Sequence, residues 1–337
     1  GTGVPRKDEA WDALGQRKKE DLKRPKDIKG LMRQCHNKLH GRGVDGDEDD
    51  LTMDMVRLIL AKAMDEERAN EYCEFYCTPE EYRTEEGRDA VASRVHSLFA
   101  QARSNNSDVF SEHEKISVGS RSICDVVIEL QRYRLLSDLH ESEDWDIMGH
   151  AYEQYTSTYL KKKRGQFLTN RLVVDFLSEA LDPDYQDIIL DPAGGSGGFL
   201  TGAMRYVRKK ILKSSATNIS KQRQLDKHRT NLFMVEISKR LVKIAKTAMI
   251  LNGDGHTGMT QGDSLGKTSD LNERVVARCG PGKPTIILTN PPFAGVGEGR
   301  ITDPQVLDNF NTGIRWSTRG GEYFSTGERN TEGVPPE

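Results

Sequence analysis

The residues best suited to bind a ligand form a glycine-rich turn after a short apolar stretch. Ile-Ile-Leu at 188–190 runs into Asp191-Pro192-Ala193-Gly194-Gly195-Ser196-Gly197-Gly198. Glycine permits positive φ and lets the backbone approach a ligand closely. The N-terminus of a following helix would present free N–H groups and a positive dipole. A buried strand that ends in an acid and leads into such a turn is typical of a nucleotide-cofactor site at the carboxyl edge of a parallel sheet.

The turn does not match the common phosphate-binding patterns. It lacks the GxGxxG spacing of dinucleotide folds and the Gly-Lys-Ser/Thr ending of a phosphate loop. Residues 194–198 formally match the GxSxG elbow of serine hydrolases, but no partner histidine is evident in the sequence. We therefore favour a cofactor turn over a hydrolase elbow and over a turn that binds nothing.

The second chemical motif is Thr289-Asn290-Pro291-Pro292-Phe293, which directly follows an apolar run. The prolines fix the backbone, the asparagine offers a carbonyl acceptor to an amino group, and the phenylalanine offers a face for stacking a flat ring. A proline-stiffened loop whose Phe293 packs in the core is the alternative. The presence of the glycine-rich turn 99 residues earlier, measured from Asp191 to Asn290, favours a binding site.

Alternating strands and helices must position these motifs. Strands are predicted at 188–190, 232–235, 259–261 and 286–289, with a helix at 239–251 between two of them. Such alternation predicts a parallel sheet covered on both faces. The last 44 residues, after Phe293, hold eight glycines and no clear strand. Because four strands are few for such a sheet, we expect part of this fold to be missing from the chain.

The first 150 residues show helical patterns instead. Apolar residues follow the spacing of one helical face around 56–64, 91–99 and 123–130. A further helix is expected over 146–160. The sequence thus predicts an all-helical domain over residues 1–150 and a partial α/β domain over 151–337, with a glycine-rich polar tail after 293.

Charge differs between the two halves. Residues 1–150 hold 23 basic and 32 acidic residues, and residues 151–337 hold 26 and 20. Nine Lys or Arg residues and one acid lie between Ala203 and Arg229, a pattern that fits either a contact with a polyanion or a solvated surface.

No apolar run approaches the roughly 18 residues that cross a bilayer. Five dispersed cysteines argue against a disulfide framework, and the CxxxC pair Cys73 and Cys77 lacks the second pair of a zinc site.

Several further segments complete a family resemblance, each in the expected order. The glycine-rich turn is preceded by Gly165-Gln166-Phe167-Leu168-Thr169, and the second predicted strand ends in Val235-Glu236-Ile237. The helical stretch over 241–253 ends in Leu-Asn-Gly and is followed by Gly262-Asp263-Ser264-Leu265. Over about residues 150–295 the chain resembles the methylation subunits of type I restriction-modification systems and related adenine-N6 DNA methyltransferases. Gly195 and Asn170 depart from that pattern, standing where the family usually has Cys and Pro.

The resemblance implies a Rossmann-like fold that uses S-adenosylmethionine to methylate adenine N6 in double-stranded DNA. It implies a cytoplasmic bacterial or archaeal enzyme that works with a specificity subunit and, in some systems, a restriction subunit, away from membranes. Residues expected to hold the cofactor are Phe167, Thr169, Asp191, Ala193, Gly194, Gly195, Ser196, Gly197, Glu236 and Asp263, and those expected at the target base are Asn290, Pro291, Pro292 and Phe293.

Two alternatives remain open at this point. Related Asn-Pro-Pro motifs serve enzymes that methylate glutamine side chains in proteins or guanine N2 in RNA. The other alternative is a non-catalytic module that engages DNA within a larger restriction complex.

Overall fold

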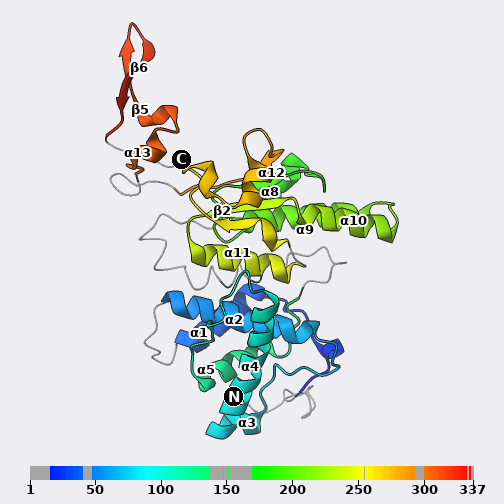
Figure 1. The fold of residues 1–337 in the computed structure, drawn as a ribbon. Coiled ribbons are helices and arrows are strands. Elements are labelled where there is room, and N and C mark those ends of the chain that lie inside the picture. Colours follow the sequence, from blue (N-terminus) through cyan, green and yellow to red (C-terminus); the bar gives the residue numbers. More distant parts are fainter. Residues whose placement is uncertain are drawn as a thin grey trace. The chain divides into compact units, whose positions relative to one another are not determined.

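The computed structural model describes residues 16–40, 48–136, 147, 151, 169–253, 255–292, 300–331 and 334. The chain divides into two compact units, one formed by residues 1–156 with 247–254 and the other by residues 157–246 with 255–337 (Figure 1). The expected helix over 146–160 falls almost wholly outside the described residues.

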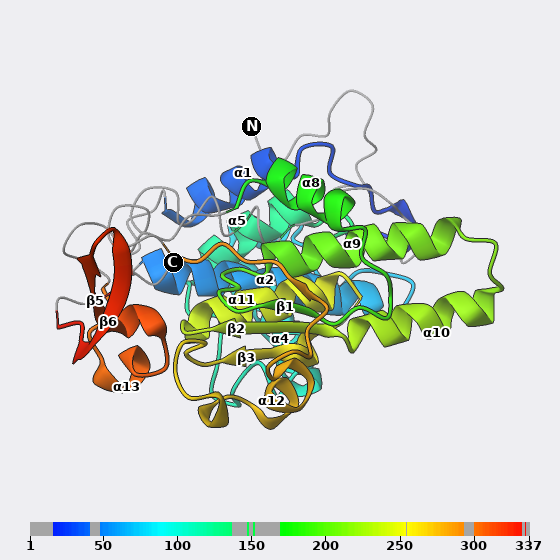
Figure 2. The same cartoon turned by 90° about the horizontal axis from the view of Figure 1, so that it is seen from above.

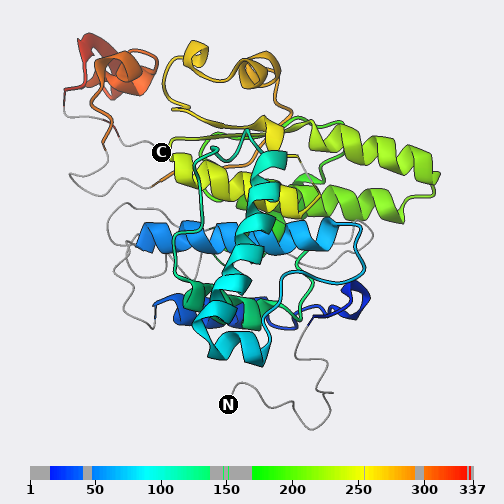
Figure 3. The same ribbon diagram turned by 60° about the horizontal axis from the view of Figure 1, so that its bottom comes forward.

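The described secondary structure of the first unit is helical. Its elements are η2 (Lys19–Asp21), α1 (Ile28–His40), α2 (Glu48–Glu67), α3 (Pro79–Arg83), α4 (Glu85–Asn105) and α5 (Ser120–Leu130). The predicted apolar faces are confirmed, because Val56, Ile59 and Leu60 of α2 and Val95 and Leu98 of α4 are all buried. Figure 3 shows α4, in cyan, crossing α2, in blue.

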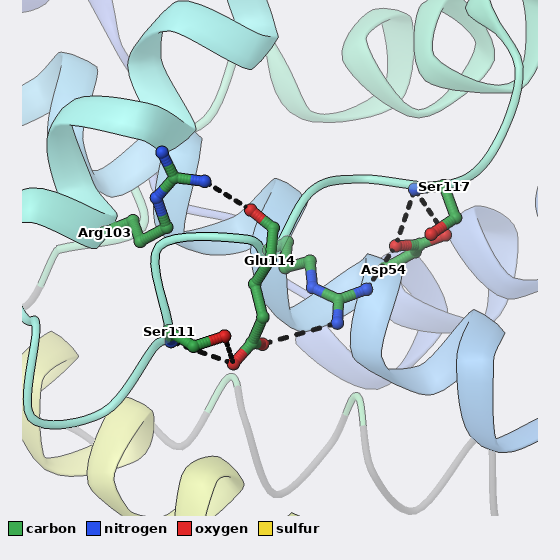
Figure 4. A network of polar contacts seen from close by, with 6 residues as sticks. Asp54, Arg103, Ser111, Glu114 and Ser117 are labelled. Carbon is green, nitrogen blue, oxygen red and sulfur yellow. Dashed lines mark hydrogen bonds and ion pairs between the residues drawn. The ribbon is translucent and has the colours of Figure 1, made fainter.

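Buried acids on α2 hold the loop between α4 and α5 in place. The carboxylate of Asp54 accepts hydrogen bonds from the backbone N–H groups of Ser117 and Val118, each at 3.0 Å, and pairs with Arg57 at 2.7 Å. Arg57 also reaches Glu114 at 3.4 Å. Figure 4 shows Asp54, Ser117 and Glu114 in this network of polar contacts. Since Asp54 is 1% exposed, these bonds are what compensates the cost of burying its charge.

The same helix fixes a second loop near its C-terminal end. Asp65 accepts the backbone N–H groups of Glu74 and Phe75, at 3.0 and 2.9 Å. Glu66 accepts that of Leu135 at 2.9 Å while it pairs with the fully buried Lys62 at 2.9 Å. The polar positions of α2 therefore serve as loop anchors, a role that apolar periodicity alone does not reveal.

The second unit is built on a parallel sheet. Its strands are β1 (Ile189–Asp191), β2 (Leu232–Glu236), β3 (Met259–Gln261) and β4 (Ile286–Ile287), in the spatial order β3-β2-β1-β4. β1 pairs in parallel with β2 and β4, and β2 with β3. All four strands were predicted, and the parallel α/β arrangement is confirmed. The chain passes from β1 outward to β3 and then crosses back to place β4 on the other side of β1.

The order of the strands creates a topological switch point beside β1. In open parallel sheets ligands bind outside the carboxyl ends of the strands, at the point where the strand order reverses. In this sheet that point lies between β1 and β4, because β2 and β3 lie on one side of β1 and β4 lies on the other. The glycine-rich turn follows β1, and the Asn-Pro-Pro motif follows β4. The topology therefore directs both predicted motifs to one edge of the sheet.

Helices cover the sheet and fill the crossovers. They are α8 (Arg171–Leu181), α9 (Gly198–Lys213), α10 (Asn218–Arg229), α11 (Lys239–Leu251), η3 (His256–Gly258), η4 (Thr268–Asp270) and α12 (Glu273–Cys279). Every residue of β2 is buried, which requires cover on both faces. Val275 of α12 packs with Phe233 and Val235 on one of them. Figure 2 shows α9 and α10 side by side, joined by a turn, and Val207 and Leu225 pack between them.

The segment after residue 300 contradicts the expectation that it forms no strand. Following α13 (Pro304–Leu307) and η5 (Asn311–Gly313), β5 (Ile314–Arg319) and β6 (Glu322–Arg329) form an antiparallel hairpin, drawn in red in Figures 1 and 2. Its two-residue loop is Gly320-Gly321, with φ of 65° and 86°. Two glycines at positive φ are a hairpin signal that the glycine-rich composition obscured. Arg329 then ties the hairpin to Asp308 through two hydrogen bonds, of 2.9 and 2.7 Å.

No helix among the described residues is both long and apolar enough to span a bilayer.

Candidate functional site

The glycine-rich turn folds back on the strand beside it. The N–H of Gly194 donates to the carbonyl of Val235 at 3.1 Å, and the N–H of Gly197 donates to the carbonyl of Gly194 at 2.8 Å. Gly195 and Gly197 adopt φ of 54° and 82°, in the left-handed region that glycine enters without steric cost. The turn thus ends at the first residue of α9, whose N-terminal N–H groups face the carboxyl edge of the sheet.

Two of these glycines are required for different reasons. A Cβ on Gly194 would lie 2.0 Å from Cγ of Met234, inside the packed side chain of β2. A Cβ on Gly197 would meet that of Ala245 at 3.0 Å while the backbone is left-handed. Gly195 differs, since nothing lies within 4 Å of the position its Cβ would take. The open side of the turn at Gly195 therefore has room for a bound group.

Glu236 closes the turn from the end of β2. One carboxylate oxygen accepts the N–H of Gly195 at 2.9 Å, and the other accepts the N–H of Ser238 at 2.8 Å. The residue is 8% exposed, so a group bound beside it would compete with little water. Each carboxylate oxygen can accept a second hydrogen bond. Glu236 can consequently hold the turn and accept two hydroxyl donors at once.

Asp191 ends β1 as a buried acid. It accepts the N–H of Ala193 at 3.1 Å, and the side chain of Thr289, which follows β4, lies nearby. Burial is the main cause that raises the pKa of Asp191 to about 7, and the charge of Glu236 raises it further, against the lowering effect of Thr289 and of the Ala193 N–H. A buried carboxylate whose pKa lies near neutral pH is a good partner for a cation, because a bound positive charge would stabilise its ionised form.

Asp263 lies after β3, at the same edge of the sheet, and is exposed. One of its oxygens accepts the N–H of Leu265 at 2.9 Å, and its carbonyl accepts that of Gly266 at 3.2 Å. These two bonds form a turn that fixes the carboxylate close to the end of its strand.

Asn290 and Thr169 meet although 121 residues separate them. The amide Nδ2 of Asn290 lies 3.2 Å from Oγ1 of Thr169, to which it donates a hydrogen bond. Both side chains are half-buried. Pro291 and Pro292 follow Asn290 outside any helix or strand, while Phe167 and Phe293 lie outside the described residues.

Reasoning from sequence missed two residues that organise the site. Thr289 lies close to Asp191 and so brings the two principal motifs together. Asn170, a departure from the family pattern, begins α8 as its N-cap, and its Oδ1 accepts the N–H of Leu172 at 2.9 Å. Asn is among the best N-cap residues. An Asn directly before an apolar helical stretch is the signal that could have identified this role.

The basic stretch over α9 and α10 is partly engaged with acids of its own unit. Arg205 pairs with Asp175 at 3.2 Å and Lys210 with Asp182 at 2.7 Å. Arg208 is 4% exposed. These three cations are thereby less available to a polyanion, and the contact of this stretch with one stays a prediction.

A family model described as N-6 DNA Methylase matches residues 143–314. The chain is 28% identical over 162 residues to the type II restriction enzyme and methyltransferase RM.BcgI of Heyndrickxia coagulans, covering 48% of this chain and 23% of that protein. It is 29% identical over 167 residues to the methylase subunit of the type I restriction enzyme EcoEI of Escherichia coli, covering 49% and 31%. The matches thus span about a quarter to a third of the length of these relatives.

Solved structures share the fold. A chain of a type I restriction-modification system, solved in a study of its assembly and conformational transition, matches with a TM-score of 0.53 at 18% identity, over 86% of this chain and 58% of that one. A chain of Vibrio vulnificus YJ016, described as a modification subunit of a type I restriction enzyme, gives 0.52 at 18% identity, over 86% and 64%. At these identities the likeness concerns the fold alone.

Proposed function

Because the chain belongs to the N-6 DNA methylase family, whose model matches slightly more than half of it, we propose that it transfers a methyl group from S-adenosylmethionine to N6 of adenine in DNA. The resemblance to methylation subunits of type I restriction-modification systems, expected from the sequence, is confirmed by the family model and the named relatives. The reaction, its substrate and its partners are our proposal.

The observation that carries the proposal is the parallel pairing of β1 with β4, in which the N–H of Leu288 donates to the carbonyl of Leu190 at 3.1 Å. This pairing brings Thr289, the residue before Asn290, close to Asp191, the acid that opens the glycine-rich turn. A cofactor held by the turn and an amino group held by Asn290 would therefore meet at one point of the sheet edge. The strand order supports this proposal, because that edge includes the switch point of the sheet, where open parallel sheets bind their ligands.

The residues around the turn fit the chemical groups of S-adenosylmethionine. The buried carboxylate of Asp191 suits the ammonium of the methionine part, and the two oxygens of Glu236 suit the two ribose hydroxyls. Asp263 suits the amino group of the adenine ring. The open space at Gly195 leaves room beside the backbone N–H groups of the turn. When bound, the sulfonium supplies a methyl group that is open to direct attack by a nitrogen.

The second motif would hold the target base. The carbonyl oxygens of Asn290 and Pro291 accept the two protons of an amino group, which orients its nitrogen lone pair toward the methyl donor. Phe293 would stack on a base extruded from the duplex. No covalent intermediate is needed, so the site works by positioning and by accepting hydrogen bonds.

We also propose that recognition of a DNA sequence comes from a specificity subunit and that a restriction subunit joins the complex in some systems. The named relatives support this, since one is a subunit of a type I enzyme and another combines restriction and methylation. The basic stretch over α9 and α10 is the surface that we expect nearest to DNA phosphates.

The test is a labelling experiment with three acceptors. The protein is incubated with S-adenosylmethionine carrying a labelled methyl group and, separately, with DNA, RNA and a protein mixture. The DNA is the host genome amplified by polymerase chain reaction, which contains every native sequence without methyl groups, and each reaction is run with and without the specificity subunit. Label in DNA is expected. Label in RNA or protein alone would favour the other amino-methyltransferases, and cofactor binding with no transfer under any condition would favour a non-catalytic module.

A further inference from the structure

We propose that the hydroxyl of Thr169 positions the amide of Asn290, so that its carbonyl oxygen faces the target amino group. This inference rests on the proposed function and adds to it a positioning residue. Sequence reasoning assigned Thr169 to the cofactor, yet its polar contact in the structure is with Asn290, at 3.2 Å.

The position of Thr169 is fixed by the helix that follows it. Asn170 caps α8, and its backbone carbonyl accepts the N–H groups of Val173 and Val174 at 2.9 and 3.1 Å. Val174 is buried against α9 at Gly202, where an added Cβ would lie 2.2 Å from its Cγ1. Since no larger residue fits at Gly202, α8 packs closely on α9. Thr169 is therefore held in place by the packing of α8 on α9, and α9 begins directly after the glycine-rich turn.

Asn290 is fixed from the other side by the sheet. β4 pairs in parallel with β1, and the N–H of Leu288 donates to the carbonyl of Leu190 at 3.1 Å. Leu288 is buried, and Pro291 restricts the backbone of Asn290 to extended conformations. The backbone of Asn290 is thus well defined. The remaining freedom is the rotation of its side chain, and in particular which end of the amide faces the crevice.

That rotation decides whether the site can bind an amino group. An asparagine amide has two donor hydrogens at Nδ2 and acceptor lone pairs at Oδ1. The exocyclic amino group of adenine is itself a donor, so it binds only to Oδ1. With Nδ2 directed to the hydroxyl of Thr169, Oδ1 is turned away from Thr169 and remains to accept from the base. Without an acceptor at Thr169, the amide would lose the contact that fixes this orientation.

Two variants of Thr169 separate a hydroxyl role from a packing role. Thr169→Val keeps the shape and removes the acceptor, whereas Thr169→Ser keeps the acceptor and removes a methyl group. We expect Thr169→Val to lower kcat about tenfold or more, because a misoriented amide affects the reacting complex most. Its affinity for S-adenosylmethionine should stay within about twofold of the wild type, and Thr169→Ser should keep kcat within about threefold.

A second readout reports the hydrogen bond without catalysis. The side-chain amide signals of Asn290 in a ¹H–¹⁵N spectrum, identified by their loss in Asn290→Ala, should shift in Thr169→Val and stay near the wild-type position in Thr169→Ser. Melting temperatures of all variants check that each one folds.

The outcomes separate this inference from the proposed function. A wild-type protein that methylates DNA while Thr169→Val retains full kcat overturns the inference and leaves the function standing. If Thr169→Val keeps kcat but loses cofactor affinity by the same factor as kcat/KM, Thr169 binds the cofactor, as the sequence predicted. That result also overturns the inference. A wild-type protein that transfers no methyl group to DNA overturns the proposed function, and the inference with it.

Discussion

The carboxylate of Glu236 and the backbone N–H of Gly195, 41 residues apart in the chain, form a 2.9 Å hydrogen bond that joins the end of β2 to the glycine-rich turn after β1. The other oxygen of the same carboxylate holds the N–H of Ser238. One side chain therefore shapes the turn and, in the proposed function, would also bind the ribose of the cofactor. A substitution of Glu236 is therefore expected to disturb the conformation of the turn and to remove the carboxylate at the same time.

Replacing Glu236 with glutamine tests that joint role. A glutamine offers one acceptor oxygen and one NH₂ group, so it must turn a donor toward either Gly195 or Ser238. We expect the affinity for S-adenosylmethionine to fall by about tenfold to a hundredfold, the range for losing hydrogen bonds to a charged group. Calorimetric titration measures it. Glu273→Gln, the same change at an exposed residue of α12, is the matched control, and equal affinities for the two variants would contradict this role.

The raised pKa of Asp191, about 7, predicts pH-dependent cofactor binding. A bound ammonium favours the ionised carboxylate, so the affinity should rise about tenfold per pH unit below 7 and level off above it. An α-amino group loses its proton near pH 8, which should weaken binding again. Titrations between pH 5.5 and 9 should therefore give an optimum between about 7 and 8, and Asp191→Asn should bind more weakly and lose the acidic limb. A flat profile in the wild type would show that Asp191 does not meet the cation.

The same shift predicts a stability effect with a definite sign. The folded-state pKa of Asp191 lies above its value of about 3.9 in an unfolded chain, so the folded protein binds this proton more tightly. The contribution of Asp191 to stability is consequently lost as pH rises from about 4 to 7. Without cofactor, Asp191→Asn should melt at a higher temperature than the wild type at pH 8 and show no such gain near pH 4. Asp270→Asn, at an exposed position, should show neither effect.

In the helical unit, the buried Asp54 predicts a large loss of stability on substitution. Asp54→Asn keeps the size of the side chain but removes the nearer of the two carboxylates that Arg57 contacts, leaving Glu114 at 3.4 Å, and cannot accept all of the loop's N–H groups. We expect a loss of about 3 kcal/mol in the free energy of unfolding, or roughly 10 °C in the melting temperature. Asp50→Asn, at an exposed position of the same helix, should change it by less than about 0.5 kcal/mol. Similar unfolding curves for the two variants would contradict the anchoring role.

The elements that could be predicted are those whose pattern is local. β3 at 259–261 and α11 at 239–251 have the expected bounds, because apolar runs between turn residues and helical periodicity are both set by neighbours in the sequence. The hairpin of β5 and β6 was missed because its strands are mostly exposed and carry no apolar alternation. Its Gly320-Gly321 loop was the available signal.

The site was predictable as a set of motifs but not as a set of contacts. The sequence order of the glycine-rich turn, Glu236 and Asn290 follows from the motif pattern. The bond from Asn290 to Thr169 and the closeness of Thr289 to Asp191 depend on how α8 and β4 pack around β1, and no local pattern encodes that packing. Glycine spacing likewise predicts a turn, whereas the need for Gly194 arises from the side chain of Met234 on the next strand.

The measurement that tests the central claim most directly is nucleoside analysis of the methylated product. Unmethylated DNA of the host genome is incubated with S-adenosylmethionine and either the wild-type protein or Asn290→Ala, with the specificity subunit present, then digested and analysed by mass spectrometry. We predict N6-methyladenine with the wild type, a loss of at least about a hundredfold with Asn290→Ala, and equal cofactor affinity for both proteins. N4-methylcytosine as the product, or normal N6-methyladenine formation by Asn290→Ala, would contradict the account.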